Sequence, residues 1–247
     1  MTGELSPPHL TWSYFRVSLV LRTDRFGPSK NPLSTLQHGF ARISTWRTVD
    51  KGDGRLTLEL TESDVDPSLL AGFSGFVVRY SVEIVDMSSI KLALVVRNTG
   101  KQPLPPFTTA LHSYFRVASS EVAVNFSAKD VVYVDQLRGS ERLINADGVF
   151  STFGTEEIDL VCINVPSRIN IIDKTSFKSS TKITLESDGL PDAVLWNPYI
   201  NKAASMSDFG DDEWQDMICV ESAAIDDPIV VGPESDWQCS VTIRISG

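Results

Sequence analysis

Hydrophobic and polar residues alternate with a period of two along much of this chain. Residues 56–60 alternate Leu with Thr and Glu, and residues 241–245 alternate Val and Ile with Thr and Arg. Such alternation is typical of a β-strand that buries one face and turns the other toward water. Stretches rich in branched and aromatic residues predict further strands at 76–85, 90–97, 121–126, 168–172 and 182–186.

Turn signals built on Gly, Asn and Asp separate these stretches. They lie at residues 52–54, 98–100, 147–148 and 188–189. Short helical turns are expected only at 67–70 and 211–217, and no strand–helix–strand alternation is visible. Many short strands with frequent turns predict an all-β sandwich or barrel. A chain of 247 residues can form this as one domain with a sizeable core.

Charge and cysteine content narrow the possible environments and partners. The net charge of −10 argues against non-specific binding of nucleic acid or an anionic membrane surface. It leaves an anionic small substrate possible, because one or two Arg side chains can hold a phosphate. The cysteines Cys162, Cys219 and Cys239 are widely spaced, which predicts reduced, buried thiols. With neither a signal peptide nor a membrane span recognisable, a cytosolic protein is expected.

Three clusters of residues could carry chemistry. They are Gln-His-Gly-Phe-Ala-Arg at 37–42, Leu-His-Ser-Tyr-Phe at 111–115, and a polar stretch that runs from residue 196 to 222. A His and a Glu in one site could act as general acid and general base. However, a His beside aromatic residues is more often structural, and a Glu in a strand usually faces solvent. The spacing of the clusters leaves both interpretations open.

Taken together, the clusters resemble the hexose-6-phosphate mutarotases, also called glucose-6-phosphate 1-epimerases, a branch of the aldose 1-epimerase-like proteins. The matching phrases are FGPSKNPLSTLQHGFARISTW, NTGKQPLPPFTTALHSYFRV and LWNPYINKAASMSDFGDDEWQDMICVES. The resemblance extends from Phe26 to the C-terminus. It implies a large antiparallel β-sandwich with few short helices, similar to galactose mutarotase. It also implies interconversion of the α and β anomers of hexose 6-phosphates without a metal or nucleotide cofactor.

The resemblance also implies roles for particular residues. His112 is the expected general acid and Glu221 the expected general base. Arg42 is expected to bind the substrate phosphate, and Gln37 and Asp159 are expected to contact the substrate. The residue after the family's Asp is commonly Arg but is Leu at position 160 here, so Asp159 could be oriented differently.

The N-terminal segment departs from the family pattern. Residues 1–25 stand where family members have several strands and an R-G-G-[IV]-P loop, so the expected sandwich domain covers residues 26–247 and lacks the first strands. Lower stability and activity than in a chain with those strands are therefore expected. Two alternatives stay open: a non-catalytic sugar-phosphate binding protein, and a mutarotase for unphosphorylated aldoses. The sequence leaves the oligomeric state open, with a monomer as the simplest expectation.

Overall fold

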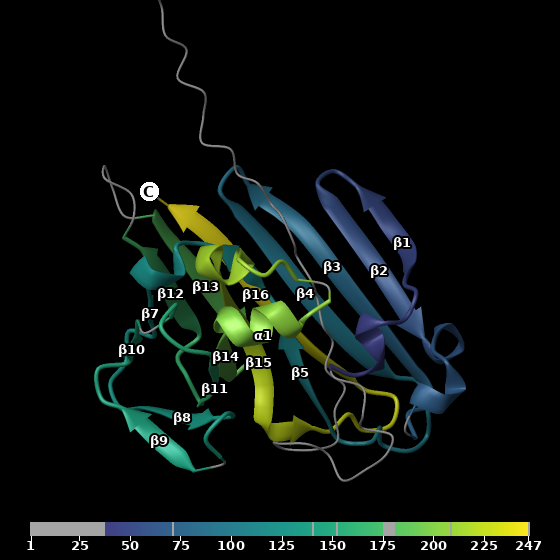
Figure 1. Cartoon of the computed structure of the whole chain (residues 1–247). Coiled ribbons are helices and arrows are strands. Elements are labelled where there is room, and N and C mark those ends of the chain that lie inside the picture. Colours follow the sequence, from purple (N-terminus) through teal and green to yellow (C-terminus); the bar gives the residue numbers. More distant parts are fainter. Residues whose placement is uncertain are drawn as a thin grey trace, which may run out of the picture.

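The computed structural model describes residues 38–70, 72–139, 141–151, 153–174, 181–207 and 209–246. Within these ranges the strands form two large sheets, and every ladder between named strands is antiparallel (Figure 1). The predicted fold class, an antiparallel β-sandwich, is confirmed. The expected N-terminal segment 1–25 and Gln37 lie outside the described residues.

The first sheet has nine strands. In spatial order they are β1 (Arg47–Gly52), β2 (Arg55–Thr61), β3 (Phe76–Asp86), β4 (Ser89–Asn98), β16 (Asp236–Ser246), β13 (Thr181–Asp188), β12 (Arg168–Asp173), β7 (Val122–Asn125) and β10 (Val149–Phe150). The C-terminal strand β16 therefore lies near the middle of the sheet, between β4 and β13.

The second sheet has seven strands. In spatial order they are β5 (Phe107–Leu111), β15 (Met217–Ile229), β14 (Asp192–Asn197), β11 (Ile158–Ile163), β8 (Val131–Asp135) and β9 (Arg142–Asn145), and β6 (Tyr114–Arg116) also pairs with β15. Strands β5 and β6 thus follow each other along the same edge of β15.

Helical structure is limited to short segments. The 3-10 turns η4 (Pro67–Leu69) and η6 (Glu213–Asp216) confirm the two predicted helical turns. Helix α1 (Tyr199–Ser205) was not predicted, because seven residues are too few to show an amphipathic period. Further 3-10 turns are η2 (Phe40–Arg42), η3 (Glu62–Asp64) and η5 (Ser119–Glu121). Among the described helices, none is long and apolar enough to cross a membrane.

The core lies between the two sheets, and strand β15 shows how its faces are divided. Ile218 and Val220 belong to the buried hydrophobic cluster that joins both sheets. Ser222, on the same face of β15, lies 2.6 Å from Ser187 of β13 through the two hydroxyl oxygens. Because successive side chains of a strand point to opposite faces, Cys219 and Glu221 must point away from this core.

The turn η2 is attached firmly to the sandwich. Phe40 and Ala41 are buried, and the Phe40 ring lies 5.8 Å from the ring of Phe73. The indole nitrogen of Trp46 donates a hydrogen bond to the Ala41 carbonyl, and the Ser44 hydroxyl donates one to the Phe40 carbonyl. These contacts fix the backbone next to residue 38.

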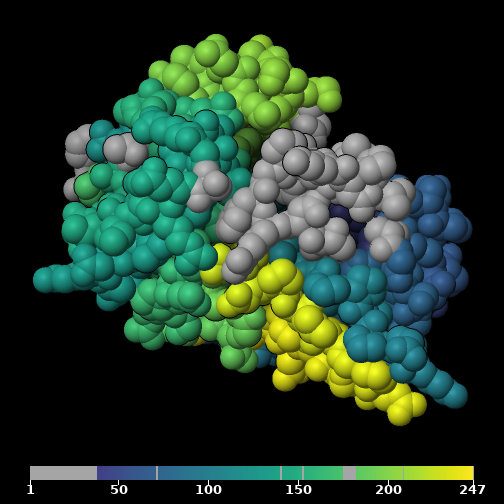
Figure 2. All heavy atoms as spheres, turned by 90° about the horizontal axis from the view of Figure 1, so that it is seen from below, coloured from purple at the N-terminus to yellow at the C-terminus, as the bar shows by residue number. Residues whose placement is uncertain are grey.

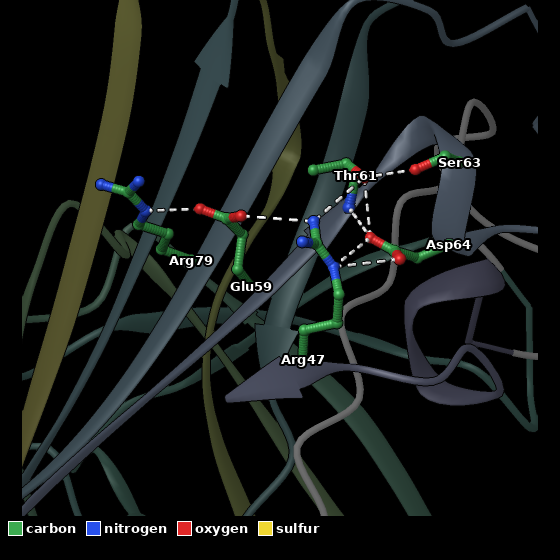
Figure 3. Close-up of polar contacts among 6 residues, drawn as sticks. All are labelled: Arg47, Glu59, Thr61, Ser63, Asp64 and Arg79. Carbon is green, nitrogen blue, oxygen red and sulfur yellow. Dashed lines mark hydrogen bonds and ion pairs between the residues drawn. The ribbon is translucent and has the colours of Figure 1, made fainter. Parts of the chain in front are cut away.

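An exposed polar network lies at the outer end of the nine-stranded sheet (Figure 3). Arg47 of β1 contacts Glu59 of β2 at 3.3 Å and Asp64 at 3.1 Å. Arg79 of β3 contacts the other oxygen of Glu59 at 2.9 Å. Asp64 also accepts hydrogen bonds from the backbone N–H and the hydroxyl of Thr61, which secures the start of η3. The network therefore links three neighbouring strands to the turn that follows β2.

The sheets place the early and middle parts of the chain at opposite sides of the molecule. Figure 2 shows the blue segment around β2 to β4 on one side and the teal segment on the other, with yellow C-terminal atoms between them. All three cysteines are free and buried, as predicted.

Candidate active site

His112 lies at the short break between β5 and β6, opposite Glu221 of β15. Leu111 pairs with Ser222 and Tyr114 pairs with Cys219, so the register across the break places His112 beside Glu221. Nδ1 of His112 is 3.2 Å from Oε1 of Glu221, and both side chains are less than a tenth exposed. The structure therefore brings together the two residues that sequence resemblance made the expected acid and base.

A row of side chains extends from this pair across the sheet. Tyr114 lies opposite Cys219, Cys219 opposite Trp196 of β14, and Trp196 opposite Asp159 of β11. Residues directly opposite each other in a ladder present their side chains on the same face. Asp159 therefore shares the face that carries Glu221, and Leu160 next to it is buried on the core face.

Aromatic rings hold the His112 imidazole on several sides. The Tyr114 ring is stacked on it with centroids 4.8 Å apart and an angle of 5° between the planes. The rings of His38 and Trp196 approach it edgewise at 5.3 Å and 6.3 Å. His38 has a backbone φ of 70°, an uncommon conformation for a residue other than Gly, and such conformations are enriched at functional sites.

Burial and neighbouring charge set the protonation of the carboxyl groups. Burial, together with the charge of Asp159, raises the pKa of Glu221 well above its usual value. Burial, followed by the charges of Glu157 and Asp135, raises the pKa of Asp159 to about 6, although Lys202 acts in the opposite direction. Burial and neighbouring carboxylates also raise the pKa of the Cys219 thiol well above its usual value. Such paired, shifted carboxyl groups are common at functional sites.

The other two expected site residues, Arg42 and Gln37, belong to the chain segment around His38, whereas the seven-stranded sheet carries His112 and Glu221. Arg42 ends η2 and is exposed, four residues beyond His38, whose ring contacts His112. A four-residue separation keeps Arg42 within reach of the same region of the surface. Gln37 precedes His38 but lies outside the described residues.

Sequence reasoning did not assign roles to several residues that surround the pair. His38, Tyr114 and Trp196 were visible within the three clusters, but the ring contacts of Tyr114 and Trp196 with His112 depend on strand register, and that of His38 depends on how the turn before η2 packs. Cys219 was predicted only as a buried thiol, whereas its sulfur lies within 4.8 Å of ligand atoms of His112 and Glu221. A period-two count from Glu221 would have placed Cys219 on the same face.

A hollow of about 200 Å³ lies elsewhere, at the turn before β8 and the end of β11. Its lining includes Lys129, Arg142 and Asn164 but not His112 or Glu221. Arg142 is engaged by the buried Asp226 at 2.7 Å. The chemistry of the imidazole–carboxylate pair is therefore separate from this hollow.

The pair is suited to moving protons at neighbouring atoms. An imidazole can donate or accept a proton near neutral pH, and a buried carboxyl group with a raised pKa can serve as a base of matched strength. The fold and this site define a β-sandwich protein with an enclosed imidazole–carboxylate pair on one sheet face.

The chain belongs to the aldose 1-epimerase family. The sequence model described as Aldose 1-epimerase matches residues 23–244, which is most of the chain. A Cenchrus ciliaris protein is 34% identical over 217 residues, and an Escherichia coli K12 protein is 28% identical over 232 residues. Both carry the name "Putative glucose-6-phosphate 1-epimerase". The aligned regions cover 84% and 90% of this chain and 64% and 71% of those two relatives.

Solved structures show the same fold. A provisionally named mutarotase from Salmonella typhimurium superposes with a TM-score of 0.74 at 24% identity, over 90% of this chain and 71% of its own. A galactose mutarotase related enzyme from Lactobacillus acidophilus superposes with a TM-score of 0.68 at 13% identity, over 94% of this chain and 81% of its own. At these identities the likeness concerns the fold. The chain spans about two thirds of the length of the curated relatives.

Proposed function

We propose that this chain interconverts the α and β anomers of a hexose 6-phosphate. The observation that carries the proposal is the buried contact of 3.2 Å between Nδ1 of His112 and Oε1 of Glu221. Family membership and the names of the two curated relatives support the same reaction class and substrate.

The geometry suits proton transfer to and from the two oxygen atoms bonded to C1 of a sugar. The anomeric hydroxyl oxygen and the ring oxygen are both bonded to C1, so an acid and a base in direct contact can reach both. Glu221 accepts the hydroxyl proton while protonated His112 donates a proton to the ring oxygen. The C1–ring oxygen bond breaks with its electron pair on the ring oxygen, and a C1 carbonyl forms. Rotation about C1–C2 and the reverse proton transfers close the other anomer.

Arg42 is the proposed contact for the phosphate. Its planar guanidinium can donate two parallel hydrogen bonds to phosphate oxygens, and the residue lies at the surface, four positions after His38. Asp159 and Gln37 are proposed to contact sugar hydroxyls. Asp159 is well placed for this because it shares the sheet face of Glu221.

Anomer exchange measured by NMR tests the proposal. Saturation transfer between the α and β anomeric protons would be recorded for glucose 6-phosphate, glucose and galactose, with and without the protein. We expect acceleration mainly for the phosphorylated sugar. Equal acceleration of free sugars would favour a mutarotase for unphosphorylated aldoses, and saturable binding without exchange would favour a non-catalytic sugar-phosphate binding protein.

The variant Arg42→Ala tests the phosphate contact. Loss of a charge-assisted hydrogen bond should raise KM for glucose 6-phosphate by about 10- to 100-fold and change KM for the free hexose little. The matched control is Arg55→Ala. Arg55 is also exposed, but it lies in the β1–β2 hairpin, where its only close acidic partner is Asp50 at 3.9 Å among the described ion pairs. Equal effects of Arg42→Ala on both sugars would make Arg42 a structural residue.

A further inference from the structure

We propose that His112, Cys219 and Glu221 form a site for a thiophilic divalent cation such as Zn²⁺, which on binding blocks the acid–base pair. The proposed reaction requires neither the cation nor the thiol of Cys219. Its inhibitory consequence rests on the proposed function, whereas binding of the cation itself does not.

The three side chains supply the donor atoms that Zn²⁺ prefers. They offer one imidazole nitrogen, one thiol sulfur and one carboxylate oxygen, and these atoms all lie within 4.8 Å of one another. Imidazole, thiolate and carboxylate are the common protein ligands of Zn²⁺, whereas Mg²⁺ and Ca²⁺ prefer oxygen ligands. The donor atoms of the cluster therefore favour Zn²⁺ over Mg²⁺ and Ca²⁺.

The spacing of the donors is close to that of a tetrahedral zinc site. Zinc–ligand bonds of about 2.0–2.3 Å place neighbouring ligand atoms about 3.4–3.6 Å apart. The separation of 3.2 Å between His112 and Glu221 already approximates one edge of such a tetrahedron. Because Cys219 and Glu221 are two residues apart on β15, their Cβ atoms share one sheet face, and side-chain rotation can close the remaining gap.

The charge around the cluster favours a cation. The cluster contains the carboxylate of Glu221, and the carboxylate of Asp159 lies on the same sheet face two strands away. Binding of Zn²⁺ to a thiolate and a carboxylate gives a neutral assembly, because the charge of the ion offsets the charges of the two ligands. The ion would therefore remove the repulsion between these two buried anions.

A bound ion would prevent the proposed proton transfers. It would occupy a nitrogen of His112 and an oxygen of Glu221, the same groups that must exchange protons with the sugar. Inhibition should therefore be reversed by a chelator and should depend on the sulfur of Cys219. The thiol itself takes no part in the proposed reaction.

Cobalt spectroscopy tests the site without relying on activity. CoCl₂ added to the reduced full chain should give a near-ultraviolet thiolate-to-cobalt band with one equivalent bound, and ZnCl₂ should abolish the band. Cys219→Ser and Cys219→Ala should remove it and weaken Zn²⁺ binding in calorimetry by about 10-fold or more. A wild-type protein with no such band would overturn the proposal, whatever the fate of the variants.

Two cysteines of the same chain provide matched controls. Cys162 and Cys239 are also free and buried, but they belong to the core between the sheets. Cys162→Ser and Cys239→Ser should therefore keep the cobalt band and the sensitivity to Zn²⁺. A band that survives Cys219→Ser but disappears in a control variant would place the metal elsewhere and refute the assignment.

Activity measurements then separate the two proposals. In wild-type protein we expect micromolar Zn²⁺, but not millimolar Mg²⁺, to stop anomer exchange, and Cys219→Ser to resist Zn²⁺ by about 10-fold or more. A cobalt band in a protein without anomer exchange would support the metal site and contradict the proposed function. Anomer exchange that Zn²⁺ does not inhibit, in a protein without a cobalt band, would support the proposed function and contradict the metal site.

Discussion

Two groups of charged side chains in this protein contain carboxylates whose pKa values are shifted in opposite directions. In the network on the nine-stranded sheet, hydrogen bonds from Thr61 lower the pKa of Asp64. In the seven-stranded sheet, burial raises the pKa of Glu221. The cationic partner of Asp64, Arg47, has a side chain 52% exposed, whereas that of His112, the partner of Glu221, is 8% exposed.

The difference teaches that the exposure of the partner and the supply of hydrogen-bond donors, more than the mere presence of an opposite charge, decide how readily a carboxylate binds a proton. Hydrogen bonds from the hydroxyl and N–H of Thr61, together with the charge of Arg47, stabilise the charged form of Asp64, so this group holds a turn in place and is a weak base. Glu221 is buried, with the thiol of Cys219 and the charge of Asp159 near it, so its charged form is costly and it binds protons readily. The first group is suited to structure and the second to chemistry.

The largest expected effect is on the rate of anomer exchange. Glu221→Gln and His112→Ala should each lower the rate by about 100-fold or more, because each removes one of the two proposed proton-transfer groups. Glu221→Gln keeps the side-chain shape and removes a buried ionisable group, so its melting temperature should not fall greatly. Rates would be measured by NMR saturation transfer and stability by thermal unfolding.

A matched control for this prediction is Glu59→Gln. It makes the same chemical change at an ion-paired carboxylate of the exposed network and should leave the rate unchanged. Near-wild-type exchange in Glu221→Gln would refute the proposed role of the buried pair. The comparison would then no longer distinguish a functional carboxylate from a structural one.

A second prediction concerns the pH dependence that Asp159 imposes on Glu221. Because the charge of Asp159 raises the pKa of Glu221, Asp159→Asn should lower that pKa and move the acidic limb of the pH–rate profile to lower pH. Loss of a sugar contact alone would reduce the rate without moving the limb. A limb that stays in place would show that the two carboxyl groups are not coupled.

The same substitution has a stability consequence of known sign. The pKa of Asp159 is about 6 in the folded chain and about 3.9 in an unfolded one, so the folded state binds more protons between these values. The contribution of Asp159 to wild-type stability should therefore fall as the pH rises from about 4 to 6, and Asp159→Asn should lack this contribution to the slope. Chemical unfolding at a series of pH values would measure it.

Strands with one buried and one more exposed face could be predicted from sequence far better than the strands that build the site. The alternation at residues 241–245 appears in β16, whose residues alternate between buried and more exposed positions. By contrast, every residue of β5 is buried, and so are the first eight residues of β15. A strand covered on both faces need not alternate, so its sequence shows no period-two pattern.

The site could be predicted only through resemblance, for a similar reason. His112 and Glu221 are 109 positions apart, and only the register of β5 and β6 on β15 brings them together. Composition and local pattern do not encode that register. The rings of Tyr114 and Trp196 approach His112 through strand pairing, and that of His38 approaches from the turn before η2, which is why these contacts could not be assigned in advance.

A smaller effect is expected from Asp64→Ala in the exposed network. Asp64 accepts hydrogen bonds of 2.8 Å and 2.7 Å from the N–H and hydroxyl of Thr61, so its loss removes a helix-start contact worth about 1 kcal/mol. Since the pKa of Asp64 is lowered by folding, its stabilisation is present above the unfolded pKa and is lost as the pH falls through the folded pKa. Urea unfolding at neutral and acidic pH should show the difference shrinking in acid.

The smallest expected effect is that of Arg79→Ala, and it tests the comparison most directly. Arg79 contacts Glu59 at 2.9 Å, a distance shorter than that between His112 and Glu221, yet its side chain is 59% exposed. Solvent screening should therefore limit the loss to less than about 1 kcal/mol, and the loss should shrink further at high salt. Urea unfolding of wild type and variant at low and high salt would measure it, with Arg55→Ala as the control for a looser pair. A loss of several kcal/mol that salt does not reduce would show that this exposed pair behaves as a buried one. Exposure would then not be what separates the carboxylates of the network from Glu221, the proposed base.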